Sequence, residues 1–255
     1  MRLRSSLAAV VAVVLVTVAP QANGAGGVAI TACGQVVTAN AFLTQDLVCT
    51  GDGIVVGASG ITIDLKGFTI RGDRDLGDYG IDDSAGYDNI TIKNGLIRNF
   101  YLGVAADGAA DSVSVSSLVA NGNSVYGISI VGDSAKVQSS TASGNATAGI
   151  FVGGDFARIK SSTAAGSSTL GFEVIGDSAQ VTSSIAAGNG VDGIYVNGDA
   201  PSIKGNHADG NGFATGASDL AGLGIHALNY TTAPVGKNIA RANDDPTDCQ
   251  PALLC

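Results

Sequence analysis

The densest cluster of ionisable side chains in this 255-residue sequence lies between Arg71 and Asp83. Its members are Arg71, Asp73, Arg74, Asp75, Asp78, Tyr79, Asp82 and Asp83. Neighbouring carboxylates are the groups that acid/base chemistry on sugars requires, and their oxygens are also the ligands that Ca²⁺ prefers. The alternative is a solvated loop in which Asp and Gly residues make turns. We take Asp82 and Asp83 as candidate catalytic residues, and the binding candidates here are Arg71, Asp73, Arg74, Asp78 and Tyr79.

A second group of candidate residues recurs at intervals of 22 residues: Ser129, Phe151, Glu173 and Tyr195. Glu173 is the only glutamate of the chain, and an aromatic residue stands on either side of it in this series. Aromatic faces suit the apolar side of a sugar ring. We therefore predict that Phe151, Glu173 and Tyr195 form a binding surface, and the alternative is a sheet surface stabilised by contacts between neighbouring strands.

A recurring series of aspartates and a search for catalytic sequence motifs give less evidence for a functional site. Asp133, Asp155, Asp177 and Asp199 also recur every 22 residues, and they predict either hydrogen bonds within each aspartate's own turn or cations bound between the turns. Neither G-x-S-x-G nor H-E-x-x-H occurs, and His207 and His226 are distant in sequence from the acidic cluster. We predict no cofactor and no dedicated metal site, and calcium remains an option without a motif.

These residues are carried by a repeat. Gly127, Gly149, Gly171 and Gly193 each open a unit of 22 residues, and a fixed period in this range is typical of solenoids. Within a unit the apolar residues alternate, which indicates short strands separated by Gly-Asp and Gly-Asn turns. Three columns are predicted to face inward, and they begin at Ile128, Val137 and Ala142 and recur every 22 residues.

The repeated units G-[IF]-x-[VI]-x-G-D and S-S-x-A-x-G-[NS], together with the T-I-D-L-x-G-x-T-I segment at 62–70, resemble those of right-handed parallel β-helix proteins of pectate-lyase-like architecture. The resemblance implies a secreted bacterial, all-β, single-stranded right-handed solenoid of about eight coils of roughly 22 residues. Known enzymes of this architecture bind sugar chains along one side, in a groove flanked by loops. Asp107 lies one coil after Asp82, so we add it to the catalytic candidates.

The coils predict the organisation of the chain. Coil starts are expected at Gly53, Gly80, Gly103, Gly127, Gly149, Gly171, Gly193 and Gly222. We expect an N-terminal cap at 25–52, coils at 53–221, and a last coil with a C-terminal cap at 222–255. Two insertions interrupt the period, at 71–80 and 212–222, and in repeat proteins insertions form loops that often bind ligands.

The N-terminus has the pattern of a secretory signal peptide. Arg2 and Arg4 precede an apolar run at 7–19, and small residues follow at Ala22 and Gly24. We predict a signal peptide at 1–24, and the alternative is a membrane anchor. No second apolar run of that length occurs, so we expect no membrane span after its removal and a secreted, periplasmic or cell-surface location.

Charge and cysteine content restrict the partners and the compartment. The net charge of −9 argues against nucleic acid and anionic membranes as partners. Four cysteines fit an oxidising compartment and allow three pairings. Local pairing of Cys33 with Cys49 and of Cys249 with Cys255 would place one disulfide at each end of the solenoid. A zinc site is the alternative, but no paired C-x-x-C spacing supports it.

Two functions of different classes are compatible with these patterns. The first is a non-catalytic protein that binds a polysaccharide or a cell-surface glycan. The second is a polysaccharide lyase, glycoside hydrolase or epimerase acting on an acidic polysaccharide at Asp82, Asp83 and Asp107. The missing catalytic motifs favour the first, and the sequence does not indicate an oligomeric state.

Overall fold

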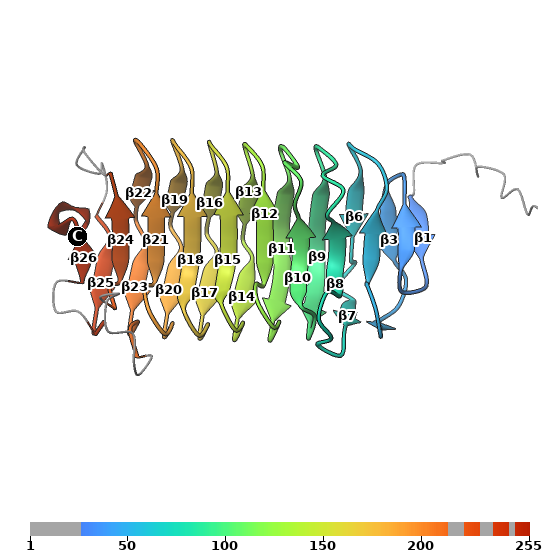
Figure 1. Cartoon of the computed structure of the whole chain (residues 1–255), viewed down its shortest axis with the longest axis horizontal. Helices are drawn as coiled ribbons and strands as arrows, with labels where there is room; N and C mark the ends of the chain where they lie inside the picture. Colours follow the sequence, from blue (N-terminus) through green and yellow to red (C-terminus); the bar gives the residue numbers. More distant parts are fainter. Residues whose placement is uncertain (1–26, 214–221, 230–236, 245–247) are drawn as a thin grey trace, which may run out of the picture.

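The computed structural model of the chain describes residues 27–213, 222–229, 237–244 and 248–255. The predicted signal peptide at 1–24 and most of the second insertion lie outside the described residues. The described chain is an all-β parallel solenoid of about nine coils, close to the predicted eight. Figure 1 shows the strands stacked side by side along one long axis.

Successive coils and the C-terminal strand β26 supply the strands of a ten-stranded parallel sheet, which we call face 1. Its strands are β2 (Gln35–Val37), β5 (Ile54–Val56), β8 (Tyr79–Asp83), β10 (Leu102–Ala106), β12 (Ile128–Val131), β15 (Ala148–Gly153), β18 (Leu170–Ile175), β21 (Ile194–Asn197), β24 (Ile225–Leu228) and β26 (Cys249–Gln250). Every pairing in this sheet is between strands of successive coils, so a residue lies beside its counterpart one coil away.

A sixteen-stranded sheet forms the other two faces. Face 2 consists of β1 (Val28–Ile30), β3 (Ala41–Leu43), β6 (Thr62–Asp64), β13 (Lys136–Gln138), β16 (Arg158–Lys160), β19 (Gln180–Thr182) and β22 (Ser202–Lys204). Face 3 consists of β4 (Leu47–Val48), β7 (Thr69–Arg71), β14 (Thr141–Ser143), β17 (Thr163–Ala165), β20 (Ile185–Ala187), β23 (His207–Asp209) and β25 (Ile239–Arg241). The long strands β9 (Thr91–Arg98) and β11 (Ser114–Asn121) run from face 2 onto face 3 and join them.

The three predicted inward columns are confirmed. Ile128 is in register with Ile150, which is in register with Phe172, and all are fully buried. The columns that begin at Val137 and Ala142 behave in the same way on faces 2 and 3. Because a single unit is too thin to bury its own apolar face, stacking supplies the hydrophobic stabilisation of every coil.

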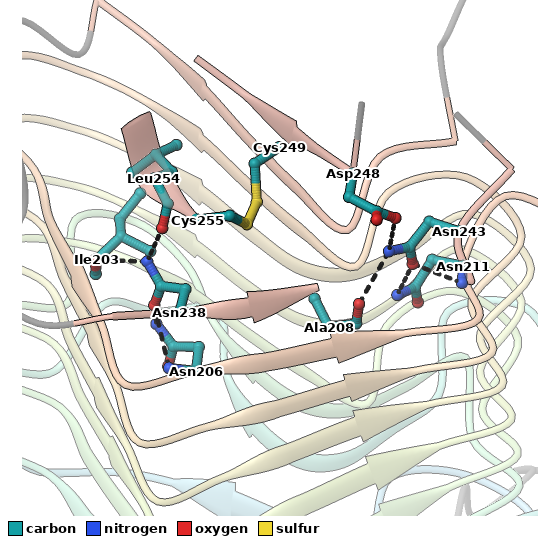
Figure 2. Close-up of a disulfide and its surroundings, with 10 residues drawn as sticks. All are labelled: Ile203, Asn206, Ala208, Asn211, Asn238, Asn243, Asp248, Cys249, Leu254 and Cys255. Atoms are coloured by element: carbon teal, nitrogen blue, oxygen red, sulfur yellow. Dashed lines mark hydrogen bonds between the residues drawn. A yellow bond between two sulfur atoms is a disulfide. The ribbon is translucent and has the colours of Figure 1, made fainter. Parts of the chain in front are cut away.

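Buried asparagines connect the coils at the corner between faces 3 and 1. The side-chain carbonyl of Asn211 accepts the backbone N–H of Asn189 at 3.0 Å, and the Asn211 amide donates to the carbonyl of Ala186 at 3.2 Å. Asn123, Asn145 and Asn243 continue this asparagine ladder, and Figure 2 shows its last step from Asn211 to Asn243. Each side chain therefore satisfies backbone groups of other coils that burial has removed from water.

The column of aspartates forms bonds between coils rather than within each turn. Asp133 Oδ1 accepts the backbone N–H of Asp155 at 2.8 Å, and Asp155 Oδ1 accepts that of Asp177 at 2.7 Å. The expected hydrogen bond to the aspartate's own turn is therefore replaced by one to the next coil. Because the corner repeats with every coil, the next N–H lies within reach of each carboxylate.

The C-terminal end differs from the expected coil start. Ile194 is in register with Ile225, so Gly224 rather than Gly222 corresponds to Gly193. Both predicted disulfides are present, and the one between Cys249 and Cys255 joins β26 to the segment after the short 3₁₀ helix η1 (Ala252–Leu254), as Figure 2 shows. The described part of the chain contains no helix with the length and apolar character of a membrane span.

Candidate functional site

The structure separates the two adjacent candidate carboxylates on β8. Asp82 is partly exposed on the outer side of face 1, and its Oδ1 accepts the backbone N–H of Ser84 at 2.9 Å. Asp83 is only 1% exposed, and its Oδ1 accepts the backbone N–H of Tyr87 at 2.9 Å. Asp83 Oδ2 is buried and has no hydrogen-bond partner among the described residues. Alternation along the strand therefore directs only Asp82 to where a polymer could contact it.

Burial and neighbouring charges raise the pKa values of two carboxyls in this region, Asp83 and Asp107. Burial raises the pKa of Asp83 to about 6, and the charges of Asp82, Asp88 and Asp107 contribute to the rise. Burial, followed by the charge of Asp82, also raises the pKa of Asp107. Carboxyls with raised pKa values are suited to proton transfer near neutral pH.

The first insertion brings three carboxylates together at the corner before β8. Oxygens of Asp73, Asp75 and Asp78 lie within 4.8 Å of one another, with Asp73 and Asp75 exposed. The pKa of Asp78 is raised by burial and by the charges of Asp52, Asp73 and Asp75. Among the described residues, these three carboxylates are close enough together to hold a divalent cation.

The arginines of the first insertion lie apart from Asp82. Arg71 is exposed on face 3, opposite Arg98 of the next coil. Arg74 Nη2 donates to Asn99 Oδ1 at 3.2 Å, and Arg74 lines a hollow of about 360 Å³ with Ser124 and Ser168. Within the described ranges, no lysine or arginine forms an ion pair with Asp82, Asp83 or Asp107.

Tyr79 is the one predicted binding residue of this cluster that lies near the carboxylates on face 1. Its ring centroid is 6.4 Å from that of Tyr101. Burial raises the pKa of Tyr79, and the charges of Asp107 and Asp82 add to the rise. Tyr79, Tyr101, Asp82 and Asp107 therefore lie close together on face 1, and Asp83 is buried beneath them. We call these five residues the acidic group.

The second candidate group is continuous on face 1. Phe151, Glu173 and Tyr195 occupy one outward column on β15, β18 and β21, and all three are partly exposed. The ring of Tyr126 stacks on Phe151, with centroids 5.2 Å apart and planes 15° apart. Burial between these neighbours raises the pKa of Glu173.

The column continues into a histidine and a buried aspartate that the sequence interpretation did not identify. His226 of β24 is in register with Tyr195, and the two rings are perpendicular with centroids 5.3 Å apart. His226 Nδ1 lies 3.0 Å from Oδ2 of Asp192, which is 1% exposed and also accepts the backbone N–H of Leu223. A step of 31 residues separates Tyr195 from His226, so the 22-residue period did not reveal the pair.

The two candidate groups remain apart. Four register steps separate Asp82 from Glu173, which is about 19 Å at the spacing of parallel strands. We call the outward column Phe151, Glu173, Tyr195 and His226 the aromatic column. It presents a ring or a hydrogen-bonding group at every coil, whereas the acidic group presents only carboxylates and tyrosines.

Comparisons of the chain with protein-family models, with curated protein sequences and with solved structures found no match.

Proposed function

We propose that this chain is a secreted protein that binds a polysaccharide or cell-surface glycan along face 1, without catalysing a reaction on it. The observation that supports this proposal is the aromatic column, in which Phe151, Glu173, Tyr195 and His226 follow one another on adjacent strands. Successive strands are about 4.8 Å apart, so an extended polymer parallel to the long axis would meet alternating rings and polar groups. Rings stack on apolar sugar faces, while Glu173 and His226 supply hydrogen bonds.

The partial burial of these side chains supports binding because little further ordering is needed. Tyr126 packs against Phe151, and Asp192 holds the ring of His226 in one orientation. Side chains that are already ordered lose less conformational entropy when a ligand binds. The aromatic column is therefore a preorganised surface rather than a set of mobile side chains.

A second candidate function is acid/base catalysis on an acidic polysaccharide by a lyase, hydrolase or epimerase activity. The observation that favours it is the raised pKa of Asp83 and Asp107 next to Asp82. The burial of Asp83 and the lack of a described cationic partner weigh against it, because a uronate substrate brings its own negative charge to this surface.

The proposed extracellular location rests on the signal-peptide pattern at 1–24 and on the two disulfides, which persist in oxidising compartments. We also propose the right-handed sense and the pectate-lyase-like relationship of the solenoid, because the repeated sequence units resemble that group and parallel crossovers are overwhelmingly right-handed.

The binding proposal is tested on a glycan array and by titration of the polymers that are retained. Tyr195→Ala is expected to weaken binding about tenfold, because it removes one stacking surface. Arg158→Ala is the matched control, since Arg158 is exposed on face 2, and it should leave affinity unchanged. Equal affinities of the Tyr195→Ala variant and the parent protein would contradict the role of the aromatic column.

The same polymers test the enzymatic alternative. Incubation followed by detection of unsaturated or newly reducing chain ends reports lyase or hydrolase activity, and a change in uronate composition reports epimerase activity. Asp82→Asn should abolish any activity that belongs to the acidic group. Retained glycan binding without product formation would support the binding function over the catalytic one.

A further inference from the structure

A hollow of about 500 Å³ lies on face 2 near the N-terminal end, away from the aromatic column of face 1. Its floor is the outward column of three adjacent strands, in which Phe42 of β3 lies opposite Asp64 of β6 and Asp64 lies opposite Lys93 of β9. Asn40, Thr62 and Lys66 also line the hollow. The volume is within the roughly 300–1,000 Å³ that small-molecule sites occupy.

Two ammonium groups share one carboxylate in this hollow. Lys66 Nζ is 3.2 Å and Lys93 Nζ is 3.7 Å from Oδ2 of Asp64. Asp64 Oδ1 accepts the backbone N–H of Lys66 at 2.9 Å and the amide of Asn94 at 3.1 Å. Burial alone would raise the pKa of Asp64, but these hydrogen bonds and the charge of Lys66 hold it below the usual value. The three charges sum to +1, in a chain whose net charge is −9.

The ammonium groups retain capacity for a ligand. Each carries three N–H donors, and among the described residues Asp64 Oδ2 is the carboxylate oxygen that both approach. Lys93 is beyond hydrogen-bond distance of that oxygen, and its side chain is 37% exposed. An anion placed between the two lysines would therefore gain charge-assisted hydrogen bonds without displacing Asp64 from its backbone contact.

The rest of the lining suits a hydroxylated ring. Phe42 is partly exposed and offers an aromatic face beside the charged groups. Asn40 Oδ1 is occupied by the backbone N–H of Thr62 at 2.8 Å, which leaves the Asn40 amide as a donor. The Thr62 hydroxyl is both donor and acceptor. Positive charge, an aromatic face and small polar groups in one hollow match a compact ligand that combines a carboxylate, an apolar ring face and hydroxyls.

We propose that this hollow binds a single acidic sugar unit, a pyranose bearing a carboxylate, with the carboxylate at Lys66 and Lys93 and the ring against Phe42. This site lies on a different face from the aromatic column and does not depend on glycan binding there. It would recognise the acidic unit as a monosaccharide or within a chain, because Lys66 and Lys93 flank a single position for a carboxylate.

The proposal is tested by titrating the purified protein with galacturonate and glucuronate while recording amide ¹H–¹⁵N spectra. We expect saturable chemical-shift changes centred on Phe42, Thr62, Lys66 and Lys93, with a millimolar or tighter dissociation constant for the uronates. Glucose, which lacks the carboxylate, should bind about tenfold more weakly or worse. No saturable shift at millimolar concentrations would overturn the site. Shifts confined to Glu173, Tyr195 and their neighbours would also overturn it, and would assign the acidic sugar to face 1.

Three variants separate the contributions of charge and ring. Lys93→Met and Lys66→Met keep the aliphatic stems and should each weaken uronate binding about tenfold. Lys136→Met is the matched control, because Lys136 is exposed on β13 of the same face and does not line the hollow, and it should bind as the parent does. Equal weakening by all three variants would indicate general electrostatic attraction and overturn the proposed contact.

A further variant and ligand test the sugar ring itself. Phe42→Leu should weaken uronate binding several-fold while leaving binding of acetate unchanged, because acetate has no ring to stack. Acetate that competes as effectively as galacturonate would overturn the sugar assignment and leave a simple anion site. An unchanged denaturation midpoint in each variant establishes that the fold persists.

Discussion

At the scale of single residues, Asp83 couples the fold to pH. It is a carboxyl with 1% exposure, one oxygen bonded to the Tyr87 backbone and the other without a described partner. Its pKa is raised from 3.8 to about 6, so the unfolded chain releases this proton at lower pH than the folded chain does. The contribution of Asp83 to the free energy of unfolding is therefore greatest below about pH 4 and decreases as the pH rises towards about 6. Above that pH the decrease in the free energy of unfolding stays constant.

We expect this loss to be roughly 3 kcal/mol, since each pKa unit corresponds to about 1.4 kcal/mol. Urea unfolding at a series of pH values from about 4 to 7 measures it. Asp83→Asn should flatten the pH dependence, because the amide does not ionise and still accepts the Tyr87 N–H. Asp209→Asn, a change at an exposed residue of β23, is the control and should keep the parent's slope. An unchanged slope in Asp83→Asn would contradict the assignment.

At the scale of structural elements, the asparagine ladder has one weak step. Ser167 stands where the neighbouring coils carry Asn145 and Asn189, and its buried hydroxyl has no partner among the described residues. Asn189 shows what a longer side chain does at this position, because its amide reaches the carbonyl of Ala164 at 3.2 Å. The Asn189 amide packs against Gly171, where a Cβ would lie 2.7 Å from its nitrogen, and Gly149 occupies the equivalent position one coil earlier.

Ser167→Asn is therefore expected to stabilise the chain by about 1 kcal/mol, because it adds a side-chain hydrogen bond to a neighbouring coil and removes an unsatisfied hydroxyl. Urea denaturation at fixed pH measures the change. Asn189→Ser, the reverse substitution one coil away, should destabilise by about 1–3 kcal/mol. Destabilisation by Ser167→Asn would show that the corner cannot accommodate the amide.

The glycines at the start of each coil permit the close approach of successive coils. A Cβ on Gly171 would lie 2.4 Å from the carbonyl oxygen of Gly193 and 2.7 Å from the Asn189 amide nitrogen. Gly171→Ala should therefore cost about 1–3 kcal/mol or more, because the coils must separate. Gly51→Ala is the control, since a Cβ there meets nothing within 4 Å, and its effect should remain within about 0.5 kcal/mol. Similar unfolding free energies for the two variants would refute this packing explanation.

At the scale of the whole molecule, each coil is held mainly by its two neighbours, so the ends have fewer contacts than the middle. Cys33–Cys49 closes a separation of 16 residues near one end, and Cys249–Cys255 closes one of 6 near the other. In the chain-entropy description the longer loop gives the larger stabilisation, about 3 kcal/mol against about 2.

We expect the double substitution Cys33→Ser/Cys49→Ser to lower the unfolding free energy more than Cys249→Ser/Cys255→Ser does, as measured by urea denaturation under non-reducing conditions. Hydrogen exchange should then increase first at the end where the disulfide was removed, while amides near Val152 and Val174 in the middle remain protected. Uniform loss of protection along the chain would contradict this nearest-neighbour behaviour.

The sequence by itself determined the coil and its inward columns, and it favoured the disulfide pairs that the structure confirms. Alternation in a strand has a period of two residues and the repeats have a period of 22, so Ile128, Ile150 and Phe172 were predictable as neighbours without coordinates. The outward series of Phe151, Glu173 and Tyr195 follows from the same regularity. Local regularity suffices wherever the connecting turns keep a constant length.

Only the tertiary structure decided which residues meet where that length changes. The step from Tyr195 to His226 is 31 residues, so the pairing of His226 with Asp192 depended on the path of an irregular insertion. The hollow at Phe42 is likewise lined by Lys66, which lies in a turn, and by Lys93, which pairs with Asp64. Lys93 follows Asp64 by 29 residues, so the 22-residue period did not predict this pair. Where an insertion changes the step between coils, the contacts depend on loop length and backbone direction, and the periodic pattern encodes neither of them.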